Sequence, residues 1–230
     1  MVYVMSDIHG QYQTFLKMLS KINFKEEDIL YILGDIIDRG PDSFEIYDYI
    51  KDKPNIIMIM GNHEKMMSNY FNEKLKKETR NHYYYMWLSN GGYLTEKVFL
   101  TKSKEEQEEI KEYLASLPYY KIVEVNNQKY LLCHAIPIIR PNKPILDEIE
   151  LNIESEDIIW GREFINRKMN NGYKVIHGHT PVQYAFGVDK IVAYNDGEYL
   201  NIDCGCAISK KLSCLRLDDF THFYVNVENS

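Results

Sequence analysis

Three short segments combine aspartate, histidine and asparagine with glycine in a pattern that could bind metal ions. They read SDIHG at residues 6–10, GDIIDRG at 34–40 and GNHE at 61–64, and two histidine segments follow at His134 and at HGHT, residues 177–180. Carboxylate, amide and imidazole ligands without thiolate suit manganese, iron or zinc. Each segment alone is commonly a turn or a surface pair, so the indication lies in their joint occurrence.

Each of these segments follows a short apolar run that predicts a buried β-strand. The runs lie at residues 1–5, 29–33, 56–60, 129–133 and 174–176. In open α/β sheets, ligands bind outside the carboxyl ends of the strands. Five polar clusters that all follow strands can therefore converge on one point. Glycines beside them allow tight turns and close backbone approach.

The first 60 residues alternate strand and helix patterns. Apolar residues at helical spacing predict a helix over 11–22 and a second helix after Pro41. Strand–helix–strand–helix–strand is the pattern of a parallel sheet with crossover helices. From residue 118 onward short β-rich runs follow one another, which predicts a β-meander. We expect a single α/β domain over residues 1–230, with two sheets and flanking helices.

The region from about 64 to 117 is predicted to be a helical elaboration of this core. Charged, amphipathic patterns indicate helices over 64–78 and 103–117. The aromatic residues between them, at 83–87, are expected to form a packing or lid surface. The charged run 104–112 is expected to be a solvated helix face.

Composition and charge argue against several classes of protein. The 230 residues carry 27 basic and 34 acidic side chains, a net charge of −7, which disfavours non-specific binding to nucleic acid or membranes. No apolar run approaches the roughly 20 residues of a membrane helix, and the first residues show no secretory signal pattern. The four cysteines lack the usual spacing of a zinc site and are expected to be reduced thiols of a cytoplasmic protein: Cys133, Cys204, Cys206 and Cys214.

Together, SDIHG, GDIIDRG, GNHE, the strand-terminal His134 and GHT resemble the signature of the metal-dependent phosphoprotein phosphatases, most closely the bacterial and phage-type members. WLSNGG at 87–92 and IIWGRE at 158–163 are also similar to that family. The resemblance implies the calcineurin-like metallophosphoesterase fold, a four-layer α/β/β/α sandwich of two mixed sheets flanked by helices. Ser6 departs from the glycine of many members, but it is not a ligand position.

The resemblance implies two divalent metal ions, with manganese as the expected ion and iron or zinc as alternatives. Asp7 and His9 would bind the first ion, and Asp35 would bridge both. The second ion would be bound by three further strand-terminal side chains, Asn62, His134 and His179. The resemblance implies that two such ions would activate a bound water for direct attack on phosphorus.

The same resemblance assigns roles to residues that bind no metal. His63 is the expected general acid for the leaving group, and Asp38 is the carboxylate that orients it. Arg39 and Arg162 would bind the phosphoryl oxygens through their planar guanidinium groups. His177, the neighbour of a ligand position, is expected to pack or to contact a ligand. A nucleophilic cysteine or serine is not expected.

Two substrate classes stay open within this family. The first is a phosphoprotein, through phosphoserine or phosphothreonine and possible phosphotyrosine activity, or a small phosphoester. The second is diadenosine tetraphosphate, cleaved symmetrically by similar chemistry. Dinucleotide hydrolases tend to lack the second aspartate of GDxxDRG and to have another residue after the GNH histidine, so Asp38 and Glu64 favour the protein phosphatases. A non-catalytic scaffold with the same fold is disfavoured, because every ligand position is filled.

Overall fold

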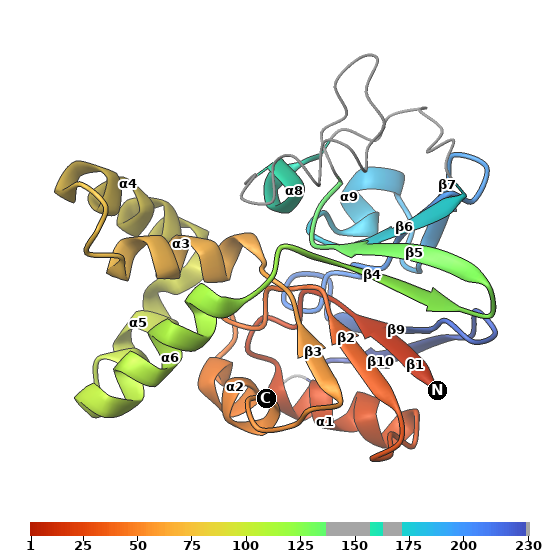
Figure 1. The fold of residues 1–230 in the computed structure, drawn as a ribbon, viewed down its shortest axis with the longest axis horizontal. Helices are drawn as coiled ribbons and strands as arrows, with labels where there is room; N and C mark the ends of the chain where they lie inside the picture. Colours follow the sequence, from red (N-terminus) through yellow and green to blue (C-terminus); the bar gives the residue numbers. More distant parts are fainter. Residues whose placement is uncertain (137–156, 163–171, 229–230) are drawn as a thin grey trace.

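The computed structural model describes residues 1–136, 157–162 and 172–228 (Figure 1). Its first sheet has the strand order β10-β9-β1-β2-β3. Its strands are β1 (Val2–Met5), β2 (Ile29–Ile32), β3 (Ile56–Met58), β9 (Lys211–Arg216) and β10 (His222–Asn226). β1, β2 and β3 run parallel, with Val4 opposite Tyr31 and Tyr31 opposite Ile57. β9 and β10 are antiparallel additions at the other edge of β1.

The second sheet has the strand order β4-β5-β6-β8-β7. Its strands are β4 (Tyr120–Val125), β5 (Gln128–Cys133), β6 (Tyr173–His177), β7 (Val192–Tyr194) and β8 (Tyr199–Asn201). The predicted meander is wrong, because β5, β6 and β8 are parallel neighbours and the β9–β10 hairpin belongs to the first sheet. Buried strands read as short apolar runs whichever way they point, so the sequence pattern does not encode their direction.

The two sheets pack face to face, and helices cover their outer faces. Apolar side chains from both sheets share the interface between them, among them Val4, Leu33, Leu132, Ile176, Leu200 and Leu215. On the outer face of the first sheet lie Tyr3 and Met5, covered by α1 (Tyr12–Lys21) and α2 (Ser43–Ile50). α8 (Asp157–Trp160) and α9 (Val182–Phe186) lie beyond the second sheet in Figure 1. The expected fold of two mixed sheets flanked by helices is confirmed.

The helical elaboration projects from one side of the sandwich (Figure 1). It comprises α3 (Asn62–Phe71), α4 (Lys77–Trp87), the π-helical turn η1 (Leu88–Gly92), α5 (Tyr93–Phe99) and α6 (Lys104–Ser116). The helix expected over 64–78 ends at Phe71, because Asn72 turns extended and its Oδ1 accepts the Lys74 N–H at 3.0 Å.

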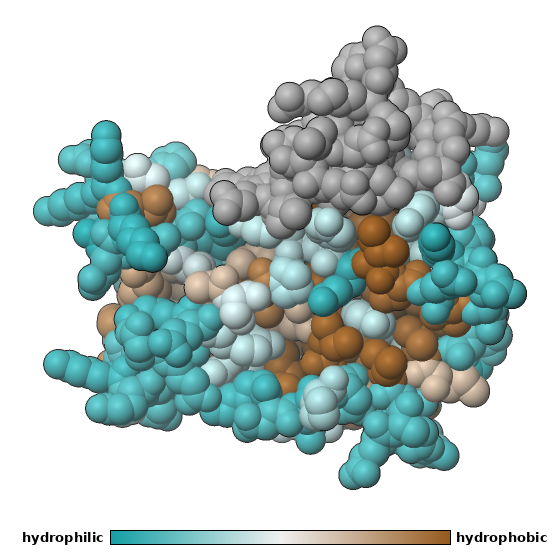
Figure 2. Space-filling model, viewed as in Figure 1, coloured by the Kyte–Doolittle hydropathy of each residue, from teal (hydrophilic) through white to brown (hydrophobic). Residues whose placement is uncertain are grey.

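The surfaces of α4 and α6 are mainly polar, and the aromatic residues of the elaboration divide between interior and surface. Figure 2 shows mainly hydrophilic side chains over α4 and α6, which agrees with the solvated face expected for residues 104–112. Trp87 is fully buried, whereas Tyr85 is 68% exposed. The aromatic run is therefore not one uniform lid surface.

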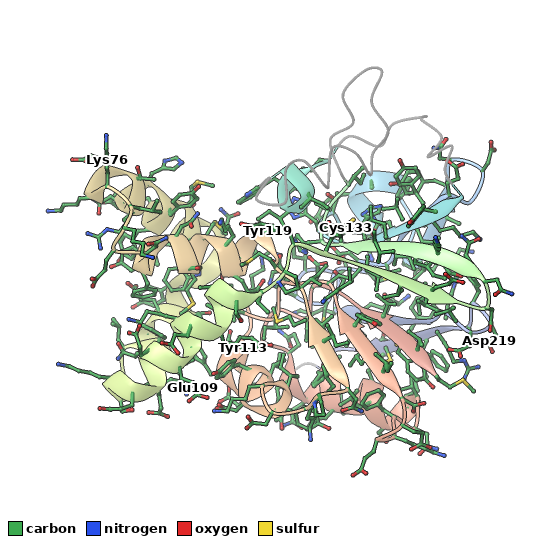
Figure 3. The ribbon with its side chains drawn as sticks, in the orientation of Figure 1. Lys76, Glu109, Tyr113, Tyr119, Cys133 and Asp219 are labelled. Carbon is green, nitrogen blue, oxygen red and sulfur yellow. The ribbon has the colours of Figure 1, made fainter. Side chains whose placement is uncertain are left out.

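All four cysteines are buried and unpaired. Cys133, labelled in Figure 3, is fully buried, as expected for the last apolar residue of β5. Burial raises the pKa of the Cys204 thiol to about 12. Among the described residues, the helices are too short or too polar to cross a membrane.

Candidate metal centre

The carboxyl ends of the parallel strands of both sheets meet at one buried site. Asp7 follows β1, Asp35 follows β2 and Asn62 follows β3, while His134 and His179 follow β5 and β6. These five residues and His9 are the six predicted ligands, and each is at most 7% exposed. The two sheets are joined directly here, since the His179 backbone N–H donates to Asp7 Oδ2 at 3.0 Å.

Six residues of the site adopt the left-handed backbone conformation. Their φ angles lie between 49° and 72°, and they are Asp7, His9, Asp35, Asp38, Arg39 and His179. This conformation costs a non-glycine residue about 1–3 kcal/mol, so the surrounding structure must hold it. Part of that support is mutual: the His9 N–H donates to the Asp35 carbonyl at 2.9 Å and the Gly10 N–H to the Ile36 carbonyl at 2.7 Å.

Two glycines allow the backbone to approach the carboxylates of the predicted ligands Asp35 and Asp7. A Cβ atom on Gly61 would overlap the Asp35 carboxylate, and one on Gly178 would overlap Ser6 Oγ and the Asp7 carboxylate. Only a residue without a side chain fits both places. The glycines of GNH and HGH thus set the distance between the strand ends and the ligands.

The atoms predicted to bind the second ion face one another at short range. His134 Nδ1 lies 2.6 Å from the Leu33 carbonyl oxygen and must donate to it, so Nε2 of the neutral ring presents a lone pair. That lone pair faces Asn62 Oδ1 at 2.9 Å and Asp35 Oδ2 at 3.5 Å, with His179 Nδ1 at 3.1 Å. Acceptors gathered in this way fit a divalent cation, and the carbonyl contact is the outer support typical of a histidine ligand.

The atoms predicted to bind the first ion are less close. His9 Nδ1 donates to the Ile37 carbonyl at 2.9 Å, which leaves Nε2 3.6 Å from Asp35 Oδ2 and 4.0 Å from Asp7 Oδ1. Arg39 Nη1 donates to the same His9 Nε2 at 2.7 Å. Burial, followed by the charges of His63 and Arg39, holds the pKa of His9 well below its usual value. The neutral His9 ring can therefore serve as a metal ligand once the Arg39 guanidinium moves away from Nε2.

His63 and Asp38 form a fully buried pair beside the first ion site. His63 Nδ1 lies 2.6 Å from Asp38 Oδ2, and its Nε2 faces Arg39 Nη2 at 3.1 Å and Asp35 Oδ2 at 3.8 Å. Burial raises the pKa of Asp38 to about 7, and burial with the Arg39 charge lowers that of His63. Among the described residues, His63 also falls into a possible ligand group with His9 and Asp35. Geometry therefore allows it either role.

Arg39 and Arg162 lie at different parts of the site. Arg39 spans His9 and His63, whereas the exposed Arg162 donates to Thr180 Oγ1 at 3.2 Å, beside His179. The last residue of IIWGRE, at 163, lies outside the described residues. His177, the last residue of β6, packs within the second sheet as expected, with its Nε2 2.8 Å from the hydroxyl of Tyr194 at the end of β7.

Glu64 has a role at the site that sequence reasoning missed. Its carboxylate accepts the N–H groups of Asp35 at 2.8 Å, Ile36 at 2.9 Å and Gly61 at 3.2 Å. Burial, followed by the charge of Asp35, raises the pKa of Glu64 to about 8. Glu64 thus ties the loop that carries Asp35 to the start of α3.

Two further residues escaped the sequence analysis. Asp203 follows β8, is 2% exposed, and has a raised pKa because of burial and the nearby charge of Asp7. Its signal was available, since Asp203 is a strand-terminal aspartate close to Gly205, like the other clusters. Trp87, read as packing, donates its indole N–H to the Asp38 carboxylate. No local pattern reveals that contact.

Comparisons with known proteins agree on one family. Residues 1–205 match the family model described as calcineurin-like phosphoesterase. Serine/threonine-protein phosphatase 2 of Salmonella typhimurium is 29% identical over 220 residues, covering 94% of this chain and 92% of that protein. The symmetrical bis(5'-nucleosyl)-tetraphosphatase of Wigglesworthia glossinidia brevipalpis is 50% identical over 64 residues, which cover 27% of this chain and 24% of that protein.

The fold also matches solved structures. A crystal structure of a candidate diadenosine tetraphosphatase superimposes with a TM-score of 0.66 at 18% identity, covering 100% of this chain and 94% of that one. A likeness at this identity establishes the shared fold and leaves the substrate to other observations.

Proposed function

Because the chain belongs to the family of calcineurin-like phosphoesterases, we propose that it is a serine/threonine protein phosphatase dependent on two divalent metal ions. Hydrolysis of phosphoric esters is the reaction class of the family and of its named phosphatase relatives. The choice of substrate rests on how much of the chain each kind of relative matches. The serine/threonine phosphatase relative matches 94% of the chain, whereas the tetraphosphatase relative matches 27%.

The metal centre fits this proposal. When bound, two divalent ions would supply Lewis-acid activation of water and neutralise charge on the phosphoryl group. Asp7, His9 and Asp35 would hold one ion, and the other would share Asp35 with Asn62, His134 and His179. Carboxylate, amide and imidazole ligands without thiolate accept manganese, iron or zinc, and manganese is proposed among them on the family resemblance.

The chain's own proton donor would be His63. Its Nδ1 is engaged by Asp38 at 2.6 Å, so its Nε2 is the atom left to carry a proton to the leaving-group oxygen. Arg39, which already spans the two histidine rings, would turn its planar donors to the phosphoryl oxygens, with Arg162 at the side of His179.

A cleft of about 560 Å³ beside Arg39 would receive the rest of the substrate. Most of its described lining residues are polar and none is aromatic: Gln11, Gln13, Thr14, Lys17, Arg39, Pro41, Asp42, Lys210, Val227 and Glu228. Proteins that bind unpaired bases commonly stack them on aromatic side chains. A polar cleft without such a ring supports an extended peptide as substrate more than an adenosine.

We also propose a cytoplasmic location without nucleic-acid or membrane partners. Four buried, unpaired cysteines suit a reducing compartment. A net charge of −7 offers no general attraction to nucleic acid.

The test is a substrate panel run with manganese, zinc, iron and magnesium. We expect higher kcat/KM on phosphoserine and phosphothreonine peptides than on diadenosine tetraphosphate. The reverse order would establish the tetraphosphatase alternative, which the 50% identity over 64 residues favours. A purified protein that neither contains a divalent metal nor responds to one would revive the scaffold interpretation.

A further inference from the structure

The helical elaboration contacts the GDIIDRG run through residues on and beside the π-helical turn η1. The Trp87 indole N–H donates to both oxygens of the Asp38 carboxylate, at 3.0 Å to Oδ1 and 2.8 Å to Oδ2. The Arg39 N–H donates to the Gly91 carbonyl at 3.1 Å, and the Asp38 N–H to Thr95 Oγ1 at 3.1 Å. Residues assigned to proton transfer and phosphate binding are thus held from the elaboration.

The two glycines of the WLSNGG segment make this contact possible. A Cβ atom on Gly92 would lie 2.5 Å from Trp87 Nε1, and one on Gly91, at φ 103°, would lie 2.9 Å from Arg39 Cγ. Glycine at both positions lets the π-helical turn lie against the indole and against Arg39. The interrupted helix therefore brings Trp87 and Gly91 onto neighbouring residues of the same catalytic run.

Trp87 is placed to fix the direction of the Asp38 carboxylate. Asp38 is fully buried, so water cannot satisfy its oxygens. One N–H that bridges both oxygens resists rotation of the carboxylate about its Cβ–Cγ bond. Oδ2, which accepts the shorter of the two bonds, is also the atom 2.6 Å from His63 Nδ1. The orientation of the indole therefore determines which atom Asp38 presents to His63.

We propose that Trp87 is a positioning residue for phosphoester hydrolysis, whose indole N–H locks the Asp38 carboxylate in the orientation that aligns His63. The inference rests on the proposed function of His63 as proton donor. It gives the WLSNGG segment a part in turnover, in place of the packing role that its sequence indicates.

The test uses Trp87→Phe, which keeps a large buried ring and removes the N–H. On phenyl phosphate, whose leaving group needs a proton, kcat should fall about 10- to 100-fold. This loss lies at or below the lower end of a general acid's contribution of roughly 10²–10⁴-fold, because His63 is misaligned rather than removed. On p-nitrophenyl phosphate, whose leaving group departs without help, the fall should be less than about 3-fold. KM should stay unchanged on both, because the ion ligands and the arginines remain.

Two further variants separate positioning from structure. Phe99→Leu trims another fully buried ring of the elaboration, whose centroid lies 4.7 Å from that of the Phe71 ring. It should lower the thermal midpoint and leave the ratio of the activities on the two substrates unchanged. Thr95→Val removes one of the two hydroxyl acceptors of the Asp38 N–H, leaving Ser43 Oγ at 3.0 Å, and should reproduce a weaker form of the selective loss. It keeps the proposal testable if Trp87→Phe does not fold.

A double-variant cycle completes the experiment. Adding Trp87→Phe to Asp38→Asn should cause no further loss on phenyl phosphate, because the two act as one unit. Equal losses on both substrates, or additive losses in the cycle, would overturn the positioning role. Turnover of a phosphopeptide by the unaltered protein reports separately on the proposed function, so the two failures are distinguishable.

Discussion

The two halves of the proposed metal centre differ in how closely the predicted ligand atoms gather. In the second half, Asn62 and Asp35 face His134 Nε2 at 2.9 and 3.5 Å, and residues of both sheets take part. In the first half, His9 Nε2 lies 3.6 Å from Asp35 and 4.0 Å from Asp7, and Arg39 donates to it. The second half is preformed, whereas the first must displace a guanidinium to accept an ion. We therefore expect the second ion to bind more tightly.

Asp35→Asn should have the largest effect, because it removes the carboxylate that the two halves share. We expect a loss of turnover beyond the roughly 10²–10³-fold cost of one electrostatic contact. Initial rates on p-nitrophenyl phosphate at saturating manganese measure it. Residual turnover within tenfold of the unaltered protein would show that the halves do not depend on a bridge.

Replacing one ligand from each half tests the difference directly. His134→Asn should lower the affinity of the tighter ion by more than the roughly 10–100-fold cost of losing an outer support. His9→Asn should leave that ion bound after dialysis and reduce only the response to added manganese. Metal content after dialysis distinguishes the two. Equal metal loss in both variants would contradict a preformed second half.

Arg39→Ala should make the first half of the metal centre bind its ion more easily, while it weakens the binding of substrate. It should raise KM roughly 10- to 100-fold, because a charge-assisted bond to phosphate is lost. It should also lower the manganese concentration needed for half-maximal activity, because His9 Nε2 no longer has a competing donor.

Arg162→Ala is the matched control for Arg39→Ala. Its contact is Thr180 rather than a ligand nitrogen, so it should raise KM without changing the manganese requirement. Parallel behaviour of the two arginine variants would argue against competition at His9.

The smallest expected effect concerns Glu64, which supports the shared loop. Burial raises its pKa from 4.5 to about 8, so the folded state binds this proton more tightly than the unfolded state. Its contribution to stability is present below pH 4.5 and is lost as the pH rises towards 8. The thermal midpoint of metal-free protein should fall over that interval, and less steeply in Glu64→Gln. Identical slopes would mean that another group sets the dependence.

The residues at the strand ends were predictable because a tight turn at a sheet edge needs particular residue types next to one another in the sequence. A polar residue beside glycine after an apolar run indicates a tight turn at a sheet edge. That pattern located Asp7, Asp35, Asn62, His134 and His179, which the structure brings together. Their roles in metal binding stay predictions until ions are measured.

Two contacts between distant segments were not predictable from local sequence patterns. Trp87 reads as one aromatic residue among several, and its bond to Asp38 spans 49 positions of the chain. The parallel pairing of β5 with β6 was not predicted either. The direction of a strand depends on how the chain connects it to its neighbours, and its hydrophobic periodicity does not show this. Asp203 differs, because it follows the strand-end pattern and was overlooked.

The buried cysteines make the protein convenient for site-specific labelling. Thiol reagents attack exposed thiolates, and all four native thiols are at most 2% exposed. A cysteine introduced at Glu108, on the outer face of α6 where the side chain is 60% exposed, would be the only accessible thiol. A fluorophore or spin label there would report on the helical elaboration during metal and substrate binding, without prior removal of any native cysteine.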